Sequence, residues 1–271
     1  MNKKGSEIVH KCEVISIANQ KGGVGKTTSS INLSASLGKL GKKTLLIDLD
    51  PQGNATTGLG INKGGIAYSV YDVLAGNCEM KKAVIKTKFT NLSILPATIN
   101  LAGIDIELVE KAYQDNNFKK NEQLKNAIDT VKEKYDYIII DCPPSLGLLT
   151  TNALVSSNSV IIPVQCEFFA LEGITQLLNT IIMTQTRLNP GLKIEGVLLT
   201  LLDSRTVLGL EVVEEVRKFF KEKVFNTIIP RLIRLVEAPS HGEPIIEYDP
   251  LSRAAEAYLN LAKEVILRDG E

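Results

Sequence analysis

The sequence predicts an α/β fold with a doubly wound, mostly parallel sheet flanked by helices. Short β-branched runs alternate with helical patterns along the chain, which is the β-α-β rhythm of such sheets. The runs at 137–141 (YIIID) and 160–164 (VIIPV) do not alternate polar and apolar residues, as is typical of parallel strands covered on both faces. No Gly/Ser/Pro-rich linker interrupts the sequence. We therefore expect a flexible N-terminal extension at 1–12 and a single domain at 13–271.

Each element of this sheet can be placed by its local pattern. Strands are expected at 14–18, 44–48, 92–95, 137–141, 160–164, 196–202 and 227–229. Helices are expected at 27–40, 101–110, 121–134, 146–155, 172–187, 210–221 and 252–267. Sheets of this kind bind ligands beyond the carboxyl ends of their strands. The polar motifs that follow strands are therefore the candidate site residues.

Charge and cysteine usage exclude several classes of protein. The 271 residues include 31 basic and 31 acidic side chains, whereas a protein that coats nucleic acid with its whole surface has a basic excess. Any DNA contact must therefore come from a local patch. The four cysteines include no CxxC pair, which argues against a disulfide framework or a metal site. The sequence has no apolar run of about 18 residues for a membrane span, and its first residues lack the apolar stretch of a secretory signal.

The most specific pattern is KGGVGKTT at 21–28, between an apolar strand and a helix. Glycines let backbone N–H groups turn inward around phosphate oxygens, and the helix adds its positive N-terminus. Lys26 is expected to reach the β- and γ-phosphates, and the Thr27 hydroxyl to bind Mg²⁺. Gln20 replaces the glycine of the ordinary GxxxxGK[ST] pattern, and a glycine-rich turn with unrelated lysines is the alternative. The expected nucleotide-binding residues are Lys21, Gly22, Gly23, Val24, Gly25, Lys26, Thr27 and Thr28.

Three aspartates follow strands and are candidates for the chemistry. Asp48 and Asp50 lie two positions apart at a strand end, so both carboxylates can share one face. Capping of a turn is the alternative role for this pair. Asp141 ends the strand YIIID, where a carboxylate beside the phosphate loop can hold Mg²⁺.

These motifs together resemble the ParA/Soj family of partition ATPases, which are P-loop proteins with a deviant Walker A motif. The resemblance covers residues 13–268 and rests on KGGVGKTT, DLDPQGN, DCPPSLGLLT, PVQCEFFALEG and EAPSHG. It implies ATP and Mg²⁺ as ligands and an ATP-dependent homodimer. It further implies that Lys21 and Lys26 are both catalytic lysines and that Lys21 touches the nucleotide of the partner subunit. Asp50 is implied to activate the attacking water.

The same resemblance extends to the metal, the base and DNA. Asp48 and Asp141 would join Thr27 around Mg²⁺, and Pro230 and Leu232 would meet the adenine; many relatives have asparagine where this chain has Leu232. The resemblance also implies non-specific binding of double-stranded DNA, a ParB-type adaptor, and a cytoplasmic, nucleoid-associated protein that segregates a chromosome or plasmid.

The expected DNA contacts are two arginines that match the family, Arg205 and Arg234. Segment 216–234 contains six basic residues and one acidic residue, which gives it a net charge of +5. A run of charge on a helix is usually a solvated face. That alternative stays open at this point.

Two other function classes compete with partition. A MinD-like membrane-cycling ATPase shares the deviant loop, but the C-terminal sequence from 252 mixes charges and ends acidic, which suits anionic lipid poorly. A metabolic nucleotide enzyme or a metallocluster carrier would need substrate or cysteine motifs that are absent from this sequence. An iron–sulfur role for Cys142 is rejected for that reason.

Overall fold

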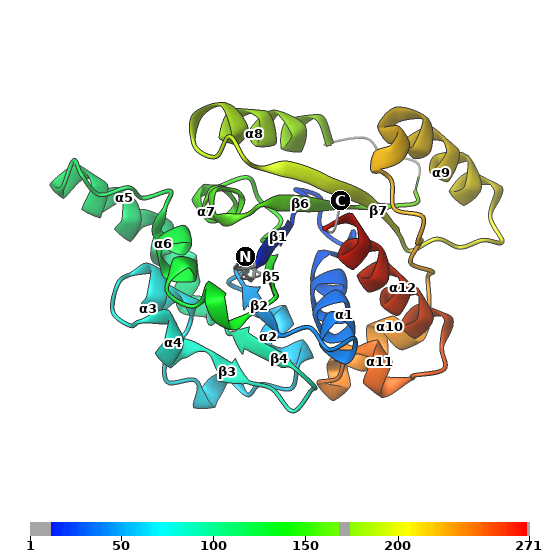
Figure 1. Ribbon diagram of the computed structural model, residues 1–271, viewed down its shortest axis with the longest axis horizontal. Coiled ribbons are helices and arrows are strands. Elements are labelled where there is room, and N and C mark those ends of the chain that lie inside the picture. Colours follow the sequence, from blue (N-terminus) through cyan, green and yellow to red (C-terminus); the bar gives the residue numbers. More distant parts are fainter. Residues whose placement is uncertain (1–11, 168–173, 270–271) are drawn as a thin grey trace, which may run out of the picture.

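The structure is a computed structural model that describes residues 12–167 and 174–269 (Figure 1). The expected N-terminal extension therefore lies, except for Cys12, outside the described residues. So do residues 168–173, which contain the end of the PVQCEFFALEG motif and the first two residues of the helix expected at 172–187.

A seven-stranded sheet runs through the described part, in the order β3-β4-β2-β5-β1-β6-β7. Every neighbouring pair is parallel except β3 and β4, so the predicted mostly parallel sheet is confirmed. The strands are β1 (Glu13–Ile17), β2 (Thr44–Asp48), β3 (Ile85–Lys86), β4 (Leu92–Leu95), β5 (Tyr137–Asp141), β6 (Ser159–Gln165) and β7 (Lys193–Thr200).

Helices cover both faces of this sheet (Figure 1). The α-helices are α1 (Lys26–Lys39), α2 (Asn54–Gly58), α3 (Val70–Leu74), α4 (Met80–Ala83), α5 (Ile104–Gln114), α6 (Gln123–Asp129), α7 (Leu148–Ser156), α8 (Ile174–Arg187), α9 (Val207–Phe220), α10 (Ile233–Glu237), α11 (Ile245–Tyr248) and α12 (Arg253–Arg268). Short 3₁₀ turns are η1 (Lys63–Gly65), η2 (Ile99–Gly103), η3 (Lys132–Lys134), η4 (Lys221–Lys223) and η5 (Ala238–His241). None of the described helices is long and apolar enough to cross a membrane.

The strand expected at 227–229 is wrong. The isolated bridges beside β7 involve the flanking residues Val224 and Pro230. Within the segment, Ile229 donates its N–H to the Leu199 carbonyl at 2.9 Å and accepts the Leu202 N–H at 3.1 Å, but no strand forms. The backbone N–H groups of Asn226 and Thr227 donate instead to the carboxylate of Glu264, at 2.9 and 3.0 Å. Pro230, which follows, has no N–H to continue a ladder. The helix expected at 121–134 is also interrupted, because α6 ends and η3 follows.

Alternation along each strand divides the core into two layers. In β5, the Ile139 side chain packs into the layer that contains the apolar residues of α1 and α12. Ile138 and Ile140 pack into the opposite layer, with α6 and α7, because successive side chains of a strand point to opposite faces. Figure 1 shows α1 and α12 side by side on their face. Both faces of the central strands are thus buried, as the apolar runs in the sequence predict.

Strand register brings the motifs together at one edge. Ile17 of β1 is paired with Asp141 of β5, and Asp141 is paired with Asp48 of β2. Because these strands are parallel, the segments that follow them leave the sheet at the same carboxyl edge. The phosphate loop therefore begins beside Asp141, and Asp48 lies one strand further along the same edge.

Two helical glycines test how closely these layers are packed. In α1, a Cβ on Gly38 would lie 2.3 Å from the backbone carbonyl oxygen of Thr90. Gly103, the last residue of η2 and the residue before α5, has a right-handed backbone conformation, and a Cβ there would meet no described atom within 4 Å. The two positions differ in surroundings rather than in helical conformation.

We expect Gly38→Ala to lower the free energy of unfolding by about 1–3 kcal/mol, because the new methyl group forces backbone apart. Gly103→Ala is the matched control and should raise the free energy of unfolding by about 0.4–1 kcal/mol, because alanine lowers the conformational entropy of the unfolded chain. Urea unfolding followed by circular dichroism measures both. Equal effects in the two variants would contradict the close packing at Gly38.

Candidate nucleotide site

The loop between β1 and α1 forms an open cradle of backbone. Gly23 and Gly25 have φ angles of 75° and 84°, in the left-handed region that favours glycine. A Cβ on Gly22 or Gly23 would meet no atom within 4 Å. Gly25 caps α1 without a side-chain hydrogen bond, and the first turn has no acidic residue. The helix N-terminus therefore directs its N–H groups and positive dipole toward an anion.

Two side chains that the sequence analysis missed anchor this loop. Asn19 donates from Nδ2 to the Pro163 carbonyl at 2.7 Å and accepts the Lys21 N–H at 3.0 Å. The Thr200 hydroxyl donates to the Val24 carbonyl at 2.8 Å. The loop is thereby tied to β6 and β7, the two strands on one side of β1. No sequence pattern near Thr200 indicates this contact, because its partner is 176 residues away.

Lys26 closes the loop from inside. Its side chain is almost fully buried, and its Nζ donates to the Lys21 carbonyl at 2.8 Å. Burial lowers the pKa of the Lys26 ammonium, and the negative charges of Asp141 and Asp50 act in the opposite direction. Lys21 itself is half-buried at the start of the loop. The arrangement places one ammonium group inside the cradle and a second lysine at its rim.

Asp141 is fully buried beside the first turn of α1. Its Oδ1 accepts a hydrogen bond from the Ser30 hydroxyl at 2.8 Å, whereas Oδ2 has no hydrogen-bond partner among the described residues. Burial and the neighbouring Asp48 charge raise the pKa of Asp141, while the hydroxyls of Thr27 and Ser30 lower it. A buried carboxylate oxygen with no partner, next to a threonine hydroxyl, fits Mg²⁺, which prefers oxygen ligands.

This donor set is small. No group of three or more His, Cys, Asp or Glu residues in the described part is arranged to hold a metal ion. Mg²⁺ is commonly bound by one or two carboxylates together with phosphate oxygens and water. The residues present therefore suit a magnesium ion that arrives with a nucleotide.

Asp48 is occupied by a different task. Its Oδ2 accepts hydrogen bonds from the Thr56 N–H at 2.8 Å and the Thr56 hydroxyl at 2.6 Å, and Oδ1 accepts the Asp50 N–H at 3.3 Å. The Thr56 hydroxyl oxygen in turn accepts the Ala97 N–H at 2.9 Å. Asp48 thus organises the turn that leads into α2, which corresponds to the turn-capping alternative. Its role in the magnesium shell stays a prediction.

Asp50 lies inside that turn, close enough to the phosphate loop for its charge to act on Lys26. Its side chain is 8% exposed, and its Oδ1 accepts the Gln52 N–H at 2.9 Å. Its carbonyl accepts the Gly53 N–H at 2.8 Å. The Asp50 charge is felt by both Lys26 and Asp141. The structure therefore brings Asp50, Lys26 and Asp141 into one electrostatic cluster.

The segment expected to meet adenine follows α9 and η4 in the chain and lies beside the carboxyl end of β7. Pro230 is bridged to Leu202, and the Arg231 N–H donates to the Leu202 carbonyl at 2.9 Å. Leu202 lies two residues beyond Thr200, which holds the phosphate loop. Leu232 is partly buried against the core layer of α1. Base contact by Pro230 and Leu232 stays a prediction, and neither side chain offers a polar group to it.

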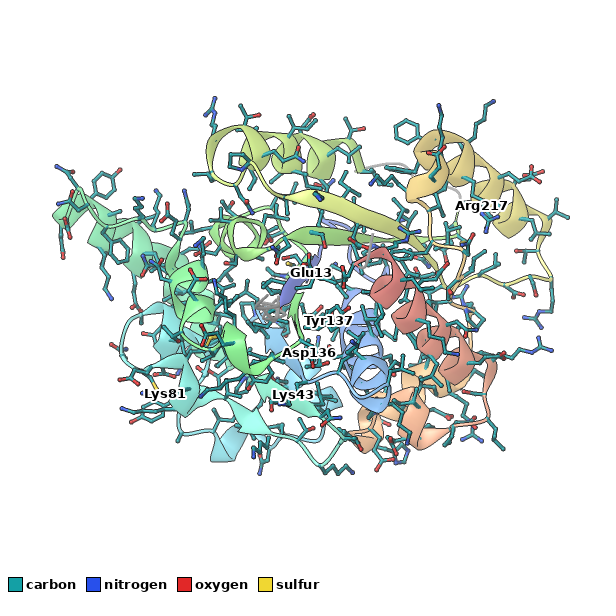
Figure 2. The ribbon with its side chains drawn as sticks, in the orientation of Figure 1. Glu13, Lys43, Lys81, Asp136, Tyr137 and Arg217 are labelled. Carbon is teal, nitrogen blue, oxygen red and sulfur yellow. The ribbon has the colours of Figure 1, made fainter. Side chains whose placement is uncertain are left out.

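The two candidate DNA arginines are exposed, and each is paired with a nearby carboxylate. Arg205 donates to both carboxylate oxygens of Asp203, at 2.9 and 2.7 Å. Nη1 of Arg234 lies 3.4 Å from Oε2 of Glu237, and Nε of Arg234 lies 3.8 Å from Oδ2 of Asp249. In the same basic segment, Figure 2 shows Arg217 on α9, near the edge of the molecule. DNA contact by these residues stays a prediction.

Comparison with known proteins agrees with this site. A family model described as an AAA domain matches residues 12–194. The sporulation initiation inhibitor protein Soj of Bacillus subtilis is 58% identical over 253 residues, which cover 93% of this chain and 98% of that protein. The chromosome partitioning protein ParA of Myxococcus xanthus is 50% identical over 256 residues, covering 94% and 88%.

A solved structure gives the same architecture. Cobyrinic acid a,c-diamide synthase from Mycobacterium smegmatis, with a bound ATP analog and magnesium, has a TM-score of 0.85 and 37% identity, covering 96% of each chain. The phosphate loop, the buried Asp141 and the sheet order therefore occur in a chain whose nearly full length matches partitioning proteins. The protein belongs to the AAA-domain family of the Soj/ParA chromosome-partitioning proteins.

Proposed function

We propose that this protein is a partition ATPase that dimerises when it binds ATP, binds DNA without sequence preference and is stimulated by a ParB-type adaptor. Its ATPase activity follows from the family and from the site. The observation that carries the proposal is the cluster of Lys26, Asp50 and Asp141 around an open glycine cradle. Strands β1 to β7 form one sheet, and the C-terminal helix α12 packs on α1 near the N-terminus. This arrangement supports treating 13–271 as one ATPase domain.

The cradle binds the triphosphate through backbone and charge. The N–H groups of the loop and the first turn of α1 surround the phosphate oxygens. Lys26 supplies a charge-assisted contact to the β- and γ-phosphates. Thr27 and the unpartnered oxygen of Asp141 hold Mg²⁺, which neutralises phosphate charge when bound.

Asp50 orients the attacking water. Its carboxylate is nearly buried and accepts the Gln52 N–H. A positioned carboxylate can accept a proton from the nucleophile or align it. Lys21 lies at the loop rim, and we assign it to the nucleotide of the partner subunit across the dimer interface.

DNA binding is assigned to the exposed basic surface. Arg205 and Arg234 are solvent-exposed, and both are held by carboxylates of their own subunit. Surface ion pairs of this kind contribute little, so DNA phosphates can compete for the guanidinium groups. Because the net charge of the chain is zero, binding depends on doubling the local contacts in a dimer. This accounts for a nucleoid-associated protein that binds DNA only with ATP.

The membrane-cycling alternative is disfavoured by α12. Its apolar residues Ala254, Ala255, Tyr258, Leu261, Ala262 and Val265 are buried in the core layer shared with α1. The apolar face that a membrane helix would need is therefore already used.

The metabolic alternative is disfavoured by the comparisons. The Mycobacterium smegmatis structure has an enzyme name, but its identity of 37% is below the 50% and 58% of the partitioning proteins. Cys142 and Cys166 are buried thiols with raised pKa values, because burial disfavours the thiolate. Two thiols buried in this way do not form the accessible pair of ligands that a cluster carrier would need.

Replacing the buried lysine should weaken nucleotide binding. We expect Lys26→Ala to lower ATP affinity by at least about tenfold, the loss typical of a charge-assisted contact. Calorimetric titration with ATP and Mg²⁺ measures this affinity. Lys39→Ala, at the exposed end of the same helix, is the control and should bind ATP normally. Unchanged ATP affinity in Lys26→Ala would move the phosphate site elsewhere.

Hydrolysis and assembly should separate in two further variants. Asp50→Ala should bind ATP and form dimers but hydrolyse ATP about 100-fold more slowly, because only the water loses its partner. Lys21→Ala should bind ATP and remain largely monomeric. Light scattering with ATP and a phosphate-release assay distinguish the two. A monomeric Asp50 variant, or a normal dimer in the Lys21 variant, contradicts the assigned roles.

Reversing the charge of the exposed arginines should remove DNA binding without affecting the nucleotide site. We expect Arg234→Glu, and to a lesser degree Arg205→Glu, to abolish ATP-dependent binding of arbitrary DNA while dimerisation and basal hydrolysis survive. Each lost phosphate contact lowers the salt slope by about 0.9. Arg187→Glu, an exposed change on α8, is the charge-matched control. Interferometry across salt concentrations tests this, and a wild-type protein that fails to bind DNA at low salt with ATP would refute the partition function.

A further inference from the structure

Lys63 is the only charged residue between Asp50 and Asp72. It begins η1, and the side chain of the preceding Asn62 accepts the Gly64 N–H at 3.0 Å. The Lys63 ammonium donates a hydrogen bond to the backbone carbonyl of Gln52. Lys63 thus binds Gln52, eleven residues before it in the chain, in the turn that also contains Asp50.

The contact is built into the shape of the turn. Gly53 has a left-handed φ of 61°, and a Cβ there would lie 2.6 Å from Cε and 2.8 Å from Nζ of Lys63. On its other side, the same Cβ would lie 3.0 Å from the Ala97 carbonyl oxygen. Gly53 is therefore enclosed between Lys63 and Ala97. The Cε and Nζ atoms of Lys63 lie against the turn.

The turn is held differently on its two sides. On the buried side, Thr56 is bound to Asp48 and to Ala97. On the outer side, the contact is the hydrogen bond from the partly exposed Lys63. The residue that Lys63 holds, Gln52, is also the residue whose N–H binds the Asp50 carboxylate. A restraint on Gln52 is therefore a restraint on Asp50.

The segment that carries Lys63 has its own anchor. A Cβ on Gly242 would lie 2.6 Å from the Cα of Gly60, and a Cβ on Gly60 would lie 3.1 Å from the Gly242 carbonyl oxygen. These two glycines pack the loop after α2 against the segment that follows η5. Lys63 is consequently presented to Gln52 from a fixed backbone rather than from a loose surface loop.

We propose that Lys63 is a positioning residue for ATP hydrolysis, which acts on the carbonyl of Gln52 to hold Asp50 in its working orientation. This rests on the proposed role of Asp50. Lys63 is assigned no contact with the nucleotide, so its loss affects turnover and leaves ATP binding intact. Small displacements of a positioned group can reduce a rate by one to two orders of magnitude.

The first experiment separates turnover from binding. Lys63→Ala should lower kcat for ATP about tenfold, with KM and ATP affinity within about twofold of the wild type. Lys63→Arg, which keeps a cationic donor, should recover at least half of the lost kcat. Lys82→Ala, an exposed lysine on α4, should match the wild type. A parallel fall in ATP affinity, or a wild-type kcat in Lys63→Ala, would overturn the proposal.

Hydrogen exchange gives a readout that a general loss of stability would not produce. In Lys63→Ala, the amides of Gln52 and Gly53 should exchange faster, while the amides of β2 and α1 keep their wild-type protection. Faster exchange across the whole chain would mean that Lys63 only stabilises the fold.

A double variant tests whether the effect passes through Asp50. Asp50→Ala with Lys63→Ala should hydrolyse ATP as slowly as Asp50→Ala alone, since the two residues act as one unit. An additional loss in the double variant would overturn the proposed route. If Asp50→Ala alone keeps a wild-type rate, the role of Asp50 fails. In that case a lowered kcat in Lys63→Ala would mean that Lys63 affects hydrolysis through a residue other than Asp50.

Discussion

The carboxylate of Asp141 is buried at the carboxyl end of β5, between β1 and β2, and the site is arranged around that charge. Its position follows from parallel register, which aligns it with Ile17 on one side and Asp48 on the other. A fully buried carboxylate is costly unless hydrogen bonds or cations compensate it. Here Ser30 satisfies one oxygen and leaves the other without a partner.

This partial compensation explains the electrostatics of the neighbouring groups. Burial raises the pKa of both Asp141 and Asp48. The charge of Asp48 raises the pKa of Asp141 further, and the charge of Asp50 raises the pKa of Asp48. Lys26 is buried nearby, and its pKa is lowered by the same loss of solvent. Three ionisable groups thus share a dry space beside an open phosphate cradle. A site of this kind gains most from a ligand that brings both a divalent cation and negative charge.

The turn after β2 shows how one edge of the sheet serves both support and chemistry. Asp48 is committed to Thr56 on the buried side of the turn, whereas Asp50 accepts the Gln52 N–H and its charge acts on Lys26. The two carboxylates are two residues apart and point to the same edge, but their partners differ. The one with more hydrogen bonds holds the backbone, and the one with fewer is available to act on a ligand.

The sequence by itself determined the sheet class, the five inner strands β4, β2, β5, β1 and β6 to within one residue, and the loop with its lysine. These features are local, because β-branched runs, glycine spacing and helix periodicity act over a few residues. It also placed Asp48, Asp50 and Asp141 at strand ends. The helices α2, α3, α4, α10 and α11 were missed because four or five residues are too few to show a helical period.

Only the tertiary structure decided which polar groups are partners. Thr200 holds a loop 176 residues away, and Glu264 takes the N–H groups of Asn226 and Thr227, at the start of the segment where a strand was expected. The turn-organising role of Asp48 depends on the Ala97 N–H, which comes from another strand end. A buried donor or acceptor must find a partner wherever the chain brings one. Local sequence therefore specifies that a polar group needs a partner, and long-range packing selects it.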